Sequence, residues 1–275
     1  MEELVIEAGR SEAHYWRDLW RFRELFGFLA WRDILVRYKQ TAIGVAWAVL
    51  RPLLTILVGT GIFGSVAQLP SDGVPYAVMV CAGTLPWFFF SSALSESANS
   101  LVGNASLISK IYFPRMILPM SAVIVALVDF AVSLIILAGL MAWYGIWPTW
   151  RLLALPIFTL LACVSAMGPG LLFTALNTKY RDFRYIVPFA VQFGLYVTPV
   201  FYSTTVIQQR LGDGGMVLLS LNPIVGVIDG FRWAICGTSG IHWQSFSLST
   251  GMSLLLLMLG SWYFRRTEKR FADVL

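Results

Sequence analysis

The sequence predicts an all-α integral membrane protein with six transmembrane helices, and two observations support this fold class. First, 57% of the 275 residues are hydrophobic and only 13% are charged, and the mean hydropathy of +0.71 exceeds what one soluble core of this length requires. Second, Lys and Arg gather in alternate connections between apolar segments, as expected of a chain that crosses a bilayer repeatedly. We expect a single transmembrane domain over residues 1–275.

The N-terminal part is expected to lie at the membrane surface. Seven of the first 18 residues are charged, unlike the start of a cleaved signal peptide, so this end should be retained and cytoplasmic. Residues 16–39 alternate apolar and polar positions at helical spacing, which predicts an amphipathic interface helix. The positions are Leu19, Phe22, Phe26 and Leu29 against Arg17, Asp18, Arg21 and Glu24. The helix serves either as an anchor or as a docking surface for a cytoplasmic partner.

Six segments are apolar over the roughly 20 residues that a membrane span requires. They cover about 42–66, 75–97, 116–144, 152–176, 185–203 and 247–264. Gly59, Gly61 and Gly64 in the first segment favour close helix contact. The fifth segment is short and is bracketed by Pro188 and Pro199.

The distribution of Lys and Arg predicts the orientation of the six spans. With six spans, 17 basic residues fall on one side and three on the other. The larger group is Arg10, Arg17, Arg21, Arg23, Arg32, Arg37, Lys39, Arg51, Lys110, Arg115, Lys179, Arg181, Arg184, Arg265, Arg266, Lys269 and Arg270, and the smaller is Arg151, Arg210 and Arg232. The positive-inside rule then places both termini in the cytoplasm, and it retains the weak fifth span.

Two connections are predicted to contain short helices. Residues 99–112 should form a cytoplasmic coupling helix between the second and third spans. Residues 204–237 contain two apolar pieces that are too short to cross, as expected of re-entrant helices on the periplasmic side. Asn222 and Pro223 supply the start of the second piece, which ends at Gly237.

The sequence offers no catalytic or metal centre. No Lys follows a Gly, which excludes a Walker A loop for ATP. His14 and His242 fall on opposite sides of the membrane in the six-span arrangement, so they do not form a paired site. The three cysteines are far apart and are interpreted as small buried hydrophobic residues. The net charge of +5 reflects the cytoplasmic clusters and not a nucleic-acid site.

Two carboxylates lie inside predicted spans. Asp129 is midway along the third span and Glu96 lies close to the cytoplasmic end of the second. Ionisable groups at such depth are functional candidates, so a proton or ion site is one interpretation. We favour a structural hydrogen bond or ion pair that faces the bundle interior, with Arg51 as a candidate partner, because an ion-coupled carrier needs several converging polar groups in broken helices.

Aromatic residues make up 15% of the chain and form two dense patches. The patches are Trp87-Phe88-Phe89-Phe90 in the second span and Phe193, Tyr196, Phe201 and Tyr202 in the fifth. Most of these rings are expected at the membrane interfaces or facing lipid. Some can instead line a conduit and stack on sugar rings, so that a glycan slides without fixed hydrogen bonds.

Several motifs occur in an informative order along the chain. They are Arg37-Tyr38-Lys39-Gln40-Thr41 with Gly44 and Trp47 to Pro52, Ile111-Tyr112-Phe113-Pro114-Arg115, Asn177-Thr178-Lys179-Tyr180-Arg181-Asp182, Leu221-Asn222-Pro223, and Gly230-Phe231-Arg232. This order resembles the permease subunits of type-two ABC exporters over nearly the whole chain from about residue 20. Within that group the chain is similar to the permeases that export lipid-linked O-antigen polysaccharide or teichoic acid.

The resemblance implies a homodimer in the inner membrane that exports a lipid-linked polysaccharide with two copies of a separate cytoplasmic ATPase. ATP and magnesium would bind to that ATPase, and this chain would be no enzyme. The implied conduit residues are Trp47, Tyr76, Trp87, Phe88, Phe193, Tyr196 and Phe201. The implied ATPase-docking residues are Arg32, Arg37, Tyr38, Lys39, Ser106 and Lys110. The implied residues of a periplasmic gate are Asn222, Pro223, Phe231 and Arg232.

Three alternatives remain open. A type-two ABC exporter of teichoic acid, a drug or a lipid would differ only in its substrate. An ion-coupled secondary transporter would need Asp129 and Glu96 to form an inward-facing site. A membrane enzyme acting on lipid-linked glycans would need a catalytic constellation, which the sequence does not offer.

Overall fold

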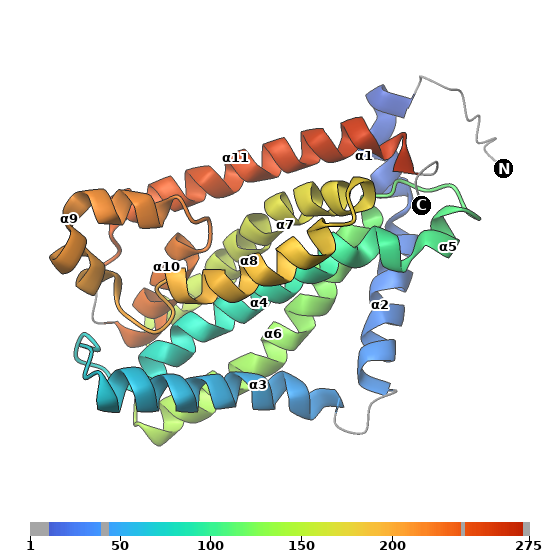
Figure 1. Cartoon of the computed structure of the whole chain (residues 1–275). Helices are drawn as coiled ribbons and strands as arrows, with labels where there is room; N and C mark the ends of the chain where they lie inside the picture. Colours follow the sequence, from blue (N-terminus) through green and yellow to red (C-terminus); the bar gives the residue numbers. More distant parts are fainter. Residues whose placement is uncertain (1–10, 40–43, 238–239, 272–275) are drawn as a thin grey trace.

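The computed structural model describes residues 11–39, 44–237 and 240–271, and this part of the chain is helical with no strand (Figure 1). Five helices are long and apolar enough to cross a membrane, or six if one bent pair is counted as a span. The long helices lie side by side, while α2 runs across one end of the bundle (Figure 1). We call this the α2 end and the opposite one the α9 end. The predicted all-α membrane fold is confirmed.

The predicted interface helix 16–39 is divided into two helices. They are α1 (Ser11–Arg21) and α2 (Arg23–Lys39), with a break at Phe22. Leu29 of α2 is fully buried against the bundle. Large apolar side chains remain exposed elsewhere on the two helices, namely Trp16, Trp20, Phe28 and Trp31. Such exposed aromatic residues are typical of a helix that lies at a membrane surface.

The long transmembrane helices run close to their predicted bounds. They are α3 (Gly44–Gly59), continued by the π-helix η1 (Thr60–Val66); α4 (Tyr76–Gly103); α6 (Ile117–Trp143); α7 (Leu155–Lys179), preceded by the 3-10 helix η2 (Trp150–Ala154); and α11 (Trp243–Glu268). Residues 42 and 43, which were predicted to begin the first span, lie outside the described residues. The side chains of α4 are largely buried, and this helix contacts α3, α6, α7 and α8. It therefore forms the centre of the bundle.

Glycines allow several helices to approach closely. A Cβ atom added at Gly59 or Gly64 would lie 2.8 Å from an aromatic ring of another segment, whereas Gly61 faces open space. Between α7 and α11, a Cβ at Gly260 would lie 2.2 Å from the carbonyl oxygen of Gly168. Small residues thus permit backbone contact between spans, as is common in membrane bundles.

The fifth predicted span, 185–203, is shorter than expected. Helix α8 covers Phe183–Val197, or 15 residues, which is about 22 Å of helix against a bilayer core of about 30 Å. The helix ends because Thr198 precedes Pro199 and is extended, with φ −78° and ψ 141°. The chain nevertheless passes from one end of the bundle to the other in this segment. At Phe201 it has reached Tyr76, the first residue of α4, whose hydroxyl donates to the Phe201 carbonyl oxygen. The crossing therefore consists of a short helix and a turn.

The predicted coupling helix 99–112 is wrong in its extent. Helix α4 continues to Gly103, and the separate helix α5 covers only Ala105–Ile108. Asn104 separates the two helices, and its side-chain amide donates to the carbonyl oxygen of Ser100 at 2.9 Å. A side chain that bonds to the backbone in this way competes with the helix. The connection is therefore one helical turn followed by irregular chain.

The predicted pair of short helices within 204–237 is confirmed. Helix α9 covers Thr204–Ser220 and α10 covers Val225–Cys236, with a bend of 112° between them. Gly212 interrupts α9 with φ +63°, and Gly237 ends α10 with φ +69°. Both angles lie in the left-handed region that favours glycine.

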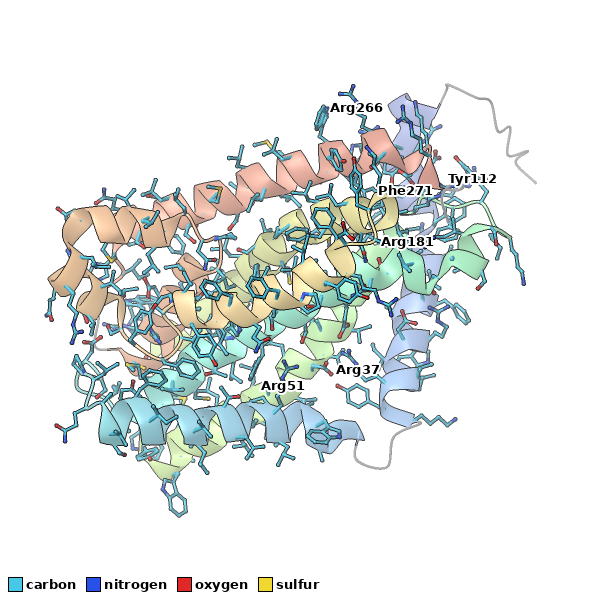
Figure 2. All side chains as sticks on the ribbon, viewed as in Figure 1. Arg37, Arg51, Tyr112, Arg181, Arg266 and Phe271 are labelled. Atoms are coloured by element: carbon cyan, nitrogen blue, oxygen red, sulfur yellow. The ribbon has the colours of Figure 1, made fainter. Side chains whose placement is uncertain are left out.

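Both ends of the described chain lie at the α2 end. The guanidinium of Arg265, in the last turn of α11, lies 4.8 Å from the ring of Tyr15 in α1. Figure 2 shows Arg181 and Arg266 at the same end of the bundle. This arrangement agrees with the alternation of basic and non-basic connections in the sequence.

Candidate transport groove and the bent helix pair

A groove of about 620 Å³ lies between α2, α3, α4 and α6. Its walls combine apolar, aromatic and charged side chains, including Arg37, Tyr38, Trp47, Arg51, Phe88, Glu96 and Asp129. Figure 2 shows Arg37 beside α2 and Arg51 above α3. The groove therefore brings together residues that the sequence assigned separately to a conduit, to docking and to an ion pair.

The two carboxylates inside the spans share one partner, Arg37. Its guanidinium donates to Asp129 Oδ2 at 2.5 Å and also to Glu96 Oε1, while the Tyr38 hydroxyl donates to Asp129 Oδ1. Burial lowers the pKa of Arg37, but the Glu96 and Asp129 carboxylates outweigh this effect and raise the pKa above its ordinary value. Arg37 is thus a fixed positive charge that holds α2 against α4 and α6.

Arg51 is not the partner that the sequence suggested for Asp129. Its guanidinium lies 4.9 Å from the centre of the Phe88 ring, in the geometry of a cation–π contact. The predicted pairing is wrong because α2 packs against α4 and α6 and brings Arg37 to Glu96, near the end of α4, and to Asp129, midway along α6. A structural ion pair facing the bundle interior is nevertheless present.

The predicted conduit residues do not form one surface in the single chain. Trp47 and Phe88 line the groove. Trp87 and Phe201 are only 3% and 6% exposed, and Tyr76 donates to the Phe201 carbonyl oxygen. Tyr76 thus joins α4 to Phe201 in the turn that follows α8, whereas Trp87 packs against Gly194 within α8.

The other two conduit residues, Phe193 and Tyr196, lie on an exposed aromatic face of α8. Tyr185 and Phe189 belong to the same face, and all four side chains are at least 60% exposed. Phe189 and Phe193 are stacked, with ring centres 6.0 Å apart. The sequence reasoning missed Tyr185 and Phe189, although their spacing of four residues along a helix could have revealed them.

The predicted docking residues divide into two groups. Lys39, Ser106 and Lys110 are exposed at the α2 end. Arg32 instead bonds within the chain, donating to the side-chain oxygen of Asn104 at 2.9 Å. Arg37 and Tyr38 also belong to the second group, because both line the groove. The first group is therefore exposed, whereas the second is bonded within the chain and only partly exposed, with the Arg32 and Arg37 side chains 36% and 33% exposed.

The predicted gate residues Asn222 and Pro223 join α10 to the bundle. The Asn222 side chain donates to Thr198 Oγ1 at 2.8 Å and accepts from the backbone N–H of Ile224 at 3.3 Å. The carbonyl oxygen of Pro223 accepts three hydroxyl groups. The donors are Ser165, Ser249 and Ser253, at 3.1, 2.9 and 3.1 Å. The sequence reasoning missed these serines, of which two lie four residues apart on α11.

Arg232, the last gate residue, is a buried clamp between α10 and the turn after α8. Its guanidinium donates to the carbonyl oxygens of Tyr202 at 2.9 Å and Val200 at 2.8 Å. Asp229 lies one turn earlier on α10 and attracts the same guanidinium electrostatically. Phe231 is fully buried beside them. This end of α10 is therefore packed into the bundle and is not a free flap.

No metal-binding cluster occurs in the described part of the chain, where no three His, Cys, Asp or Glu side chains gather suitably. The cysteines form no disulfide; Cys81 is buried, and Cys163 and Cys236 are half-buried. Their positions fit the interpretation as small hydrophobic residues.

The fold and the site together indicate a membrane transport subunit. It has membrane-spanning helices, a groove with aromatic and charged walls between them, and a bent helix pair at one end. The chain belongs to the ABC-2 type transporter family, whose model matches residues 24–236. The resemblance expected from the motifs is thereby confirmed.

Curated relatives cover most of the chain. The chain is 28% identical to "O-antigen export system permease protein RfbA" of Myxococcus xanthus, over 94% of this chain and 97% of the relative. It is 28% identical to the protein of the same name in Klebsiella pneumoniae, over 89% and 92%. It is 23% identical to "Polysialic acid transport protein KpsM" of Escherichia coli, over 86% and 91%. These relatives support a permease subunit of an ABC polysaccharide exporter.

Proposed function

We propose that this chain is the channel-forming subunit of an ATP-driven exporter that moves a lipid-linked polysaccharide across the inner membrane. Relatives named for O-antigen export and polysialic acid transport support a glycan substrate over a drug or a small lipid. The α2 end, which carries most of the basic residues, faces the cytoplasm with both termini, and the α9 end faces the periplasm.

The single observation that carries the proposal is the way α2 is fastened to the spans. Arg32 bonds to Asn104 just after α4, and Arg37 pairs with Glu96 of α4 and Asp129 of α6. A force applied to α2 is therefore passed directly to two membrane helices. We assign that force to a cytoplasmic ATPase, which binds ATP and magnesium and docks near Lys39, Ser106 and Lys110.

A second copy of the chain completes the conduit in this proposal. The aromatic face of α8 and the groove beside α3 are both open at the surface of one chain. A homodimer with two ATPase copies would enclose these surfaces between two permease subunits. Sugar rings need a wide passage, and aromatic walls allow a glycan to slide.

Reconstitution tests the proposal. The chain and its ATPase partner are placed in proteoliposomes with a lipid-linked glycan, and the glycan that becomes accessible on the far side is measured. We expect ATP-dependent transport that stops when the Walker A Lys of the ATPase is replaced and that survives collapse of ion gradients. Transport by the chain alone, or loss of transport on collapse of the gradients, would instead support an ion-coupled carrier.

A further inference from the structure

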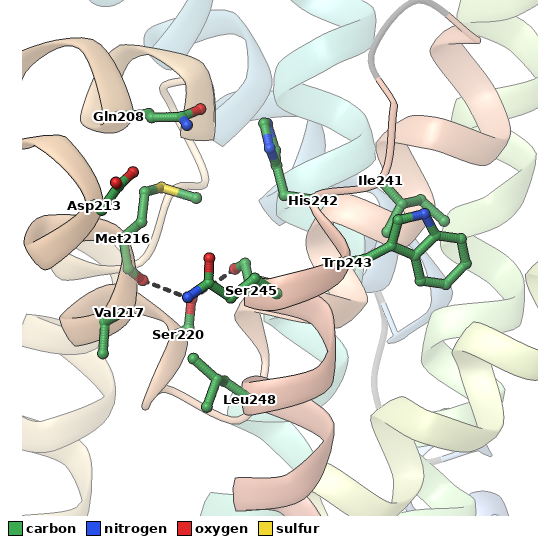
Figure 3. Close-up of a pocket in the computed structure, with 11 residues that line it drawn as sticks. Gln208, Asp213, Met216, Val217, Ser220, Ile241, His242, Trp243, Ser245 and Leu248 are labelled. Carbon is green, nitrogen blue, oxygen red and sulfur yellow. Dashed lines mark hydrogen bonds between the residues drawn. The ribbon is translucent and has the colours of Figure 1, made fainter.

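A second cavity, of about 280 Å³, lies at the α9 end between α9 and the start of α11 (Figure 3). Among the hydrogen-bonding side chains that line it are four that we call the rim residues: Gln208, Asp213, His242 and Gln244. The first two belong to α9 but lie on opposite sides of its break at Gly212. Gln244 lies at the beginning of α11, and His242 is the residue just before that helix. Three stretches of chain therefore meet around one cavity.

The rim residues are available to a ligand, whereas the polar groups of the floor are not. Among the described residues, no rim side chain forms a hydrogen bond or ion pair with another residue. On the floor, the Ser220 hydroxyl is bonded to the Met216 carbonyl oxygen at 2.6 Å and to the Ser245 hydroxyl at 2.7 Å (Figure 3). The fold thus satisfies the floor by itself and leaves the rim to solvent or a ligand.

The lining chemistry selects a neutral ligand rich in hydroxyl groups. Amide, carboxylate and imidazole groups together donate and accept hydrogen bonds, as hydroxyl groups require. No Lys or Arg lines the cavity, so it lacks a countercharge for phosphate, and its single Asp is too little for a divalent cation. Met216, Val217 and Leu248 supply an apolar wall for the C–H face of a sugar ring. The volume lies just below the range of about 300–1,000 Å³ that drug-sized ligands occupy.

We infer that this cavity binds one or two neutral sugar units of the exported glycan where the glycan leaves the protein. The inference rests on the proposed function, because it takes the α9 end as the exit side. Gln208 and Asp213 flank Gly212, which has φ +63°, so a sugar bound to both would bridge the two halves of α9 and fix their angle. Glycan at the exit would thereby set the shape of the bent helix pair.

Saturation-transfer NMR on the complete transporter in nanodiscs tests this site. The probe is a set of short neutral oligosaccharides, released by mild acid from the surface polysaccharide of cells that carry the chain. We expect transfer to the wild type and an affinity loss of about fivefold or more in Gln208→Ala, which removes an amide group, and in Asp213→Asn, which replaces one acceptor oxygen of the carboxylate by an NH2 donor. The matched control is Gln209→Ala, because Gln209 is the exposed neighbour outside the cavity. Inorganic phosphate should not compete.

Three results would overturn the inference: no transfer to the wild type, equal effects of Gln208→Ala and Gln209→Ala, or competition by phosphate. Thermal unfolding of each variant shows whether it is folded, and Asp213→Asn provides a near-isosteric second test. Glycan export in the proteoliposome assay distinguishes failure of this inference from failure of the proposed function. Glycan export without binding at the cavity would refute only this inference, whereas absence of ATP-driven glycan export would refute the proposed function itself.

Discussion

The two ends of the bundle are held together by different kinds of contact. At the α2 end, Arg37 pairs with Glu96 and Asp129, and the three side chains are 33%, 28% and 25% exposed. At the α9 end, Arg232 is 5% exposed and bonds to backbone carbonyl oxygens, and the serines around Pro223 are all buried. One end therefore uses partly exposed charges, and the other uses a buried network.

This difference assigns separate roles to the two ends. Partly exposed ion pairs contribute little to stability because water and salt replace them at low cost, so they can be exchanged during a transport cycle. A buried network is costly to disrupt because each released polar group loses its partner without gaining water. We therefore expect substitutions at the α9 end to act mainly on folding and those at the α2 end mainly on transport.

The largest effect is expected from Arg232→Met. The substitution removes both bonds to the turn after α8 and leaves the buried Asp229 carboxylate without its neighbouring charge. We expect the free energy of unfolding to fall by about 3–5 kcal/mol, measured by SDS titration in detergent micelles. The double variant Asp229→Asn with Arg232→Met should recover part of this loss. Breaking a buried pair usually costs about 3–5 kcal/mol, so an unfolding free energy within about 1 kcal/mol of the wild type would contradict the buried clamp.

Gly230→Ala tests how tightly the α9 end is packed. A Cβ at Gly230 would lie 2.4 Å from the ring of Phe158, which is itself surrounded by the rings of Phe231, Trp233 and Phe246. Because this ring has little room to move, we expect a loss of about 1–3 kcal/mol in the same titration. The control is Gly139→Ala on α6, where the new methyl group meets open space. Equal stabilities for the two variants would show that α10 is loosely packed.

Ser249→Ala probes the hydroxyl network at the start of α10. The Ser249 hydroxyl donates to the carbonyl oxygens of Asn222 and Pro223, both at 2.9 Å, and accepts from the N–H of Gly226 at 3.0 Å. Losing it leaves a buried backbone donor unsatisfied, which should cost about 1–2 kcal/mol. The control is Ser247→Ala, at an exposed position two residues earlier on α11. It should change stability by less than about 0.5 kcal/mol. A similar cost at both serines would argue against a special network.

The sequence predicted some regions of this fold well and others poorly, for physical reasons. The long spans followed from their apolar length, and the end of α10 followed from Gly237, whose φ is +69°. The length of α8 was overestimated because the apolar stretch continues past Pro199, although the chain is no longer helical there. The extent of the helix predicted at 99–112 was wrong because α4 continues to Gly103 and ends at Asn104, where the only local signal is a side-chain bond to the backbone.

Long-range pairings were the least predictable part of the candidate groove. Arg37 and Asp129 are 92 positions apart, and Arg37 precedes the first span. Arg51 lies inside a span and was the more obvious partner by composition alone. Only the path of α2 across the bundle decides between the two arginines.

Arg37→Met should have the smallest effect on stability and a large effect on export. Because the pair is partly exposed, we expect the free energy of unfolding to fall by only about 1 kcal/mol. Export should fall strongly, since α2 loses its connections to α4 and α6. Adding Glu96→Gln and Asp129→Asn removes the uncompensated carboxylates, so stability should recover while export does not. The matched control is Arg23→Met at the exposed start of α2, whose guanidinium contacts Trp20 of α1, through the carbonyl oxygen at 3.5 Å and the ring centre at 5.8 Å. If the triple variant exports glycan at the wild-type rate, α2 transmits force by some other contact and the contrast between the two ends fails.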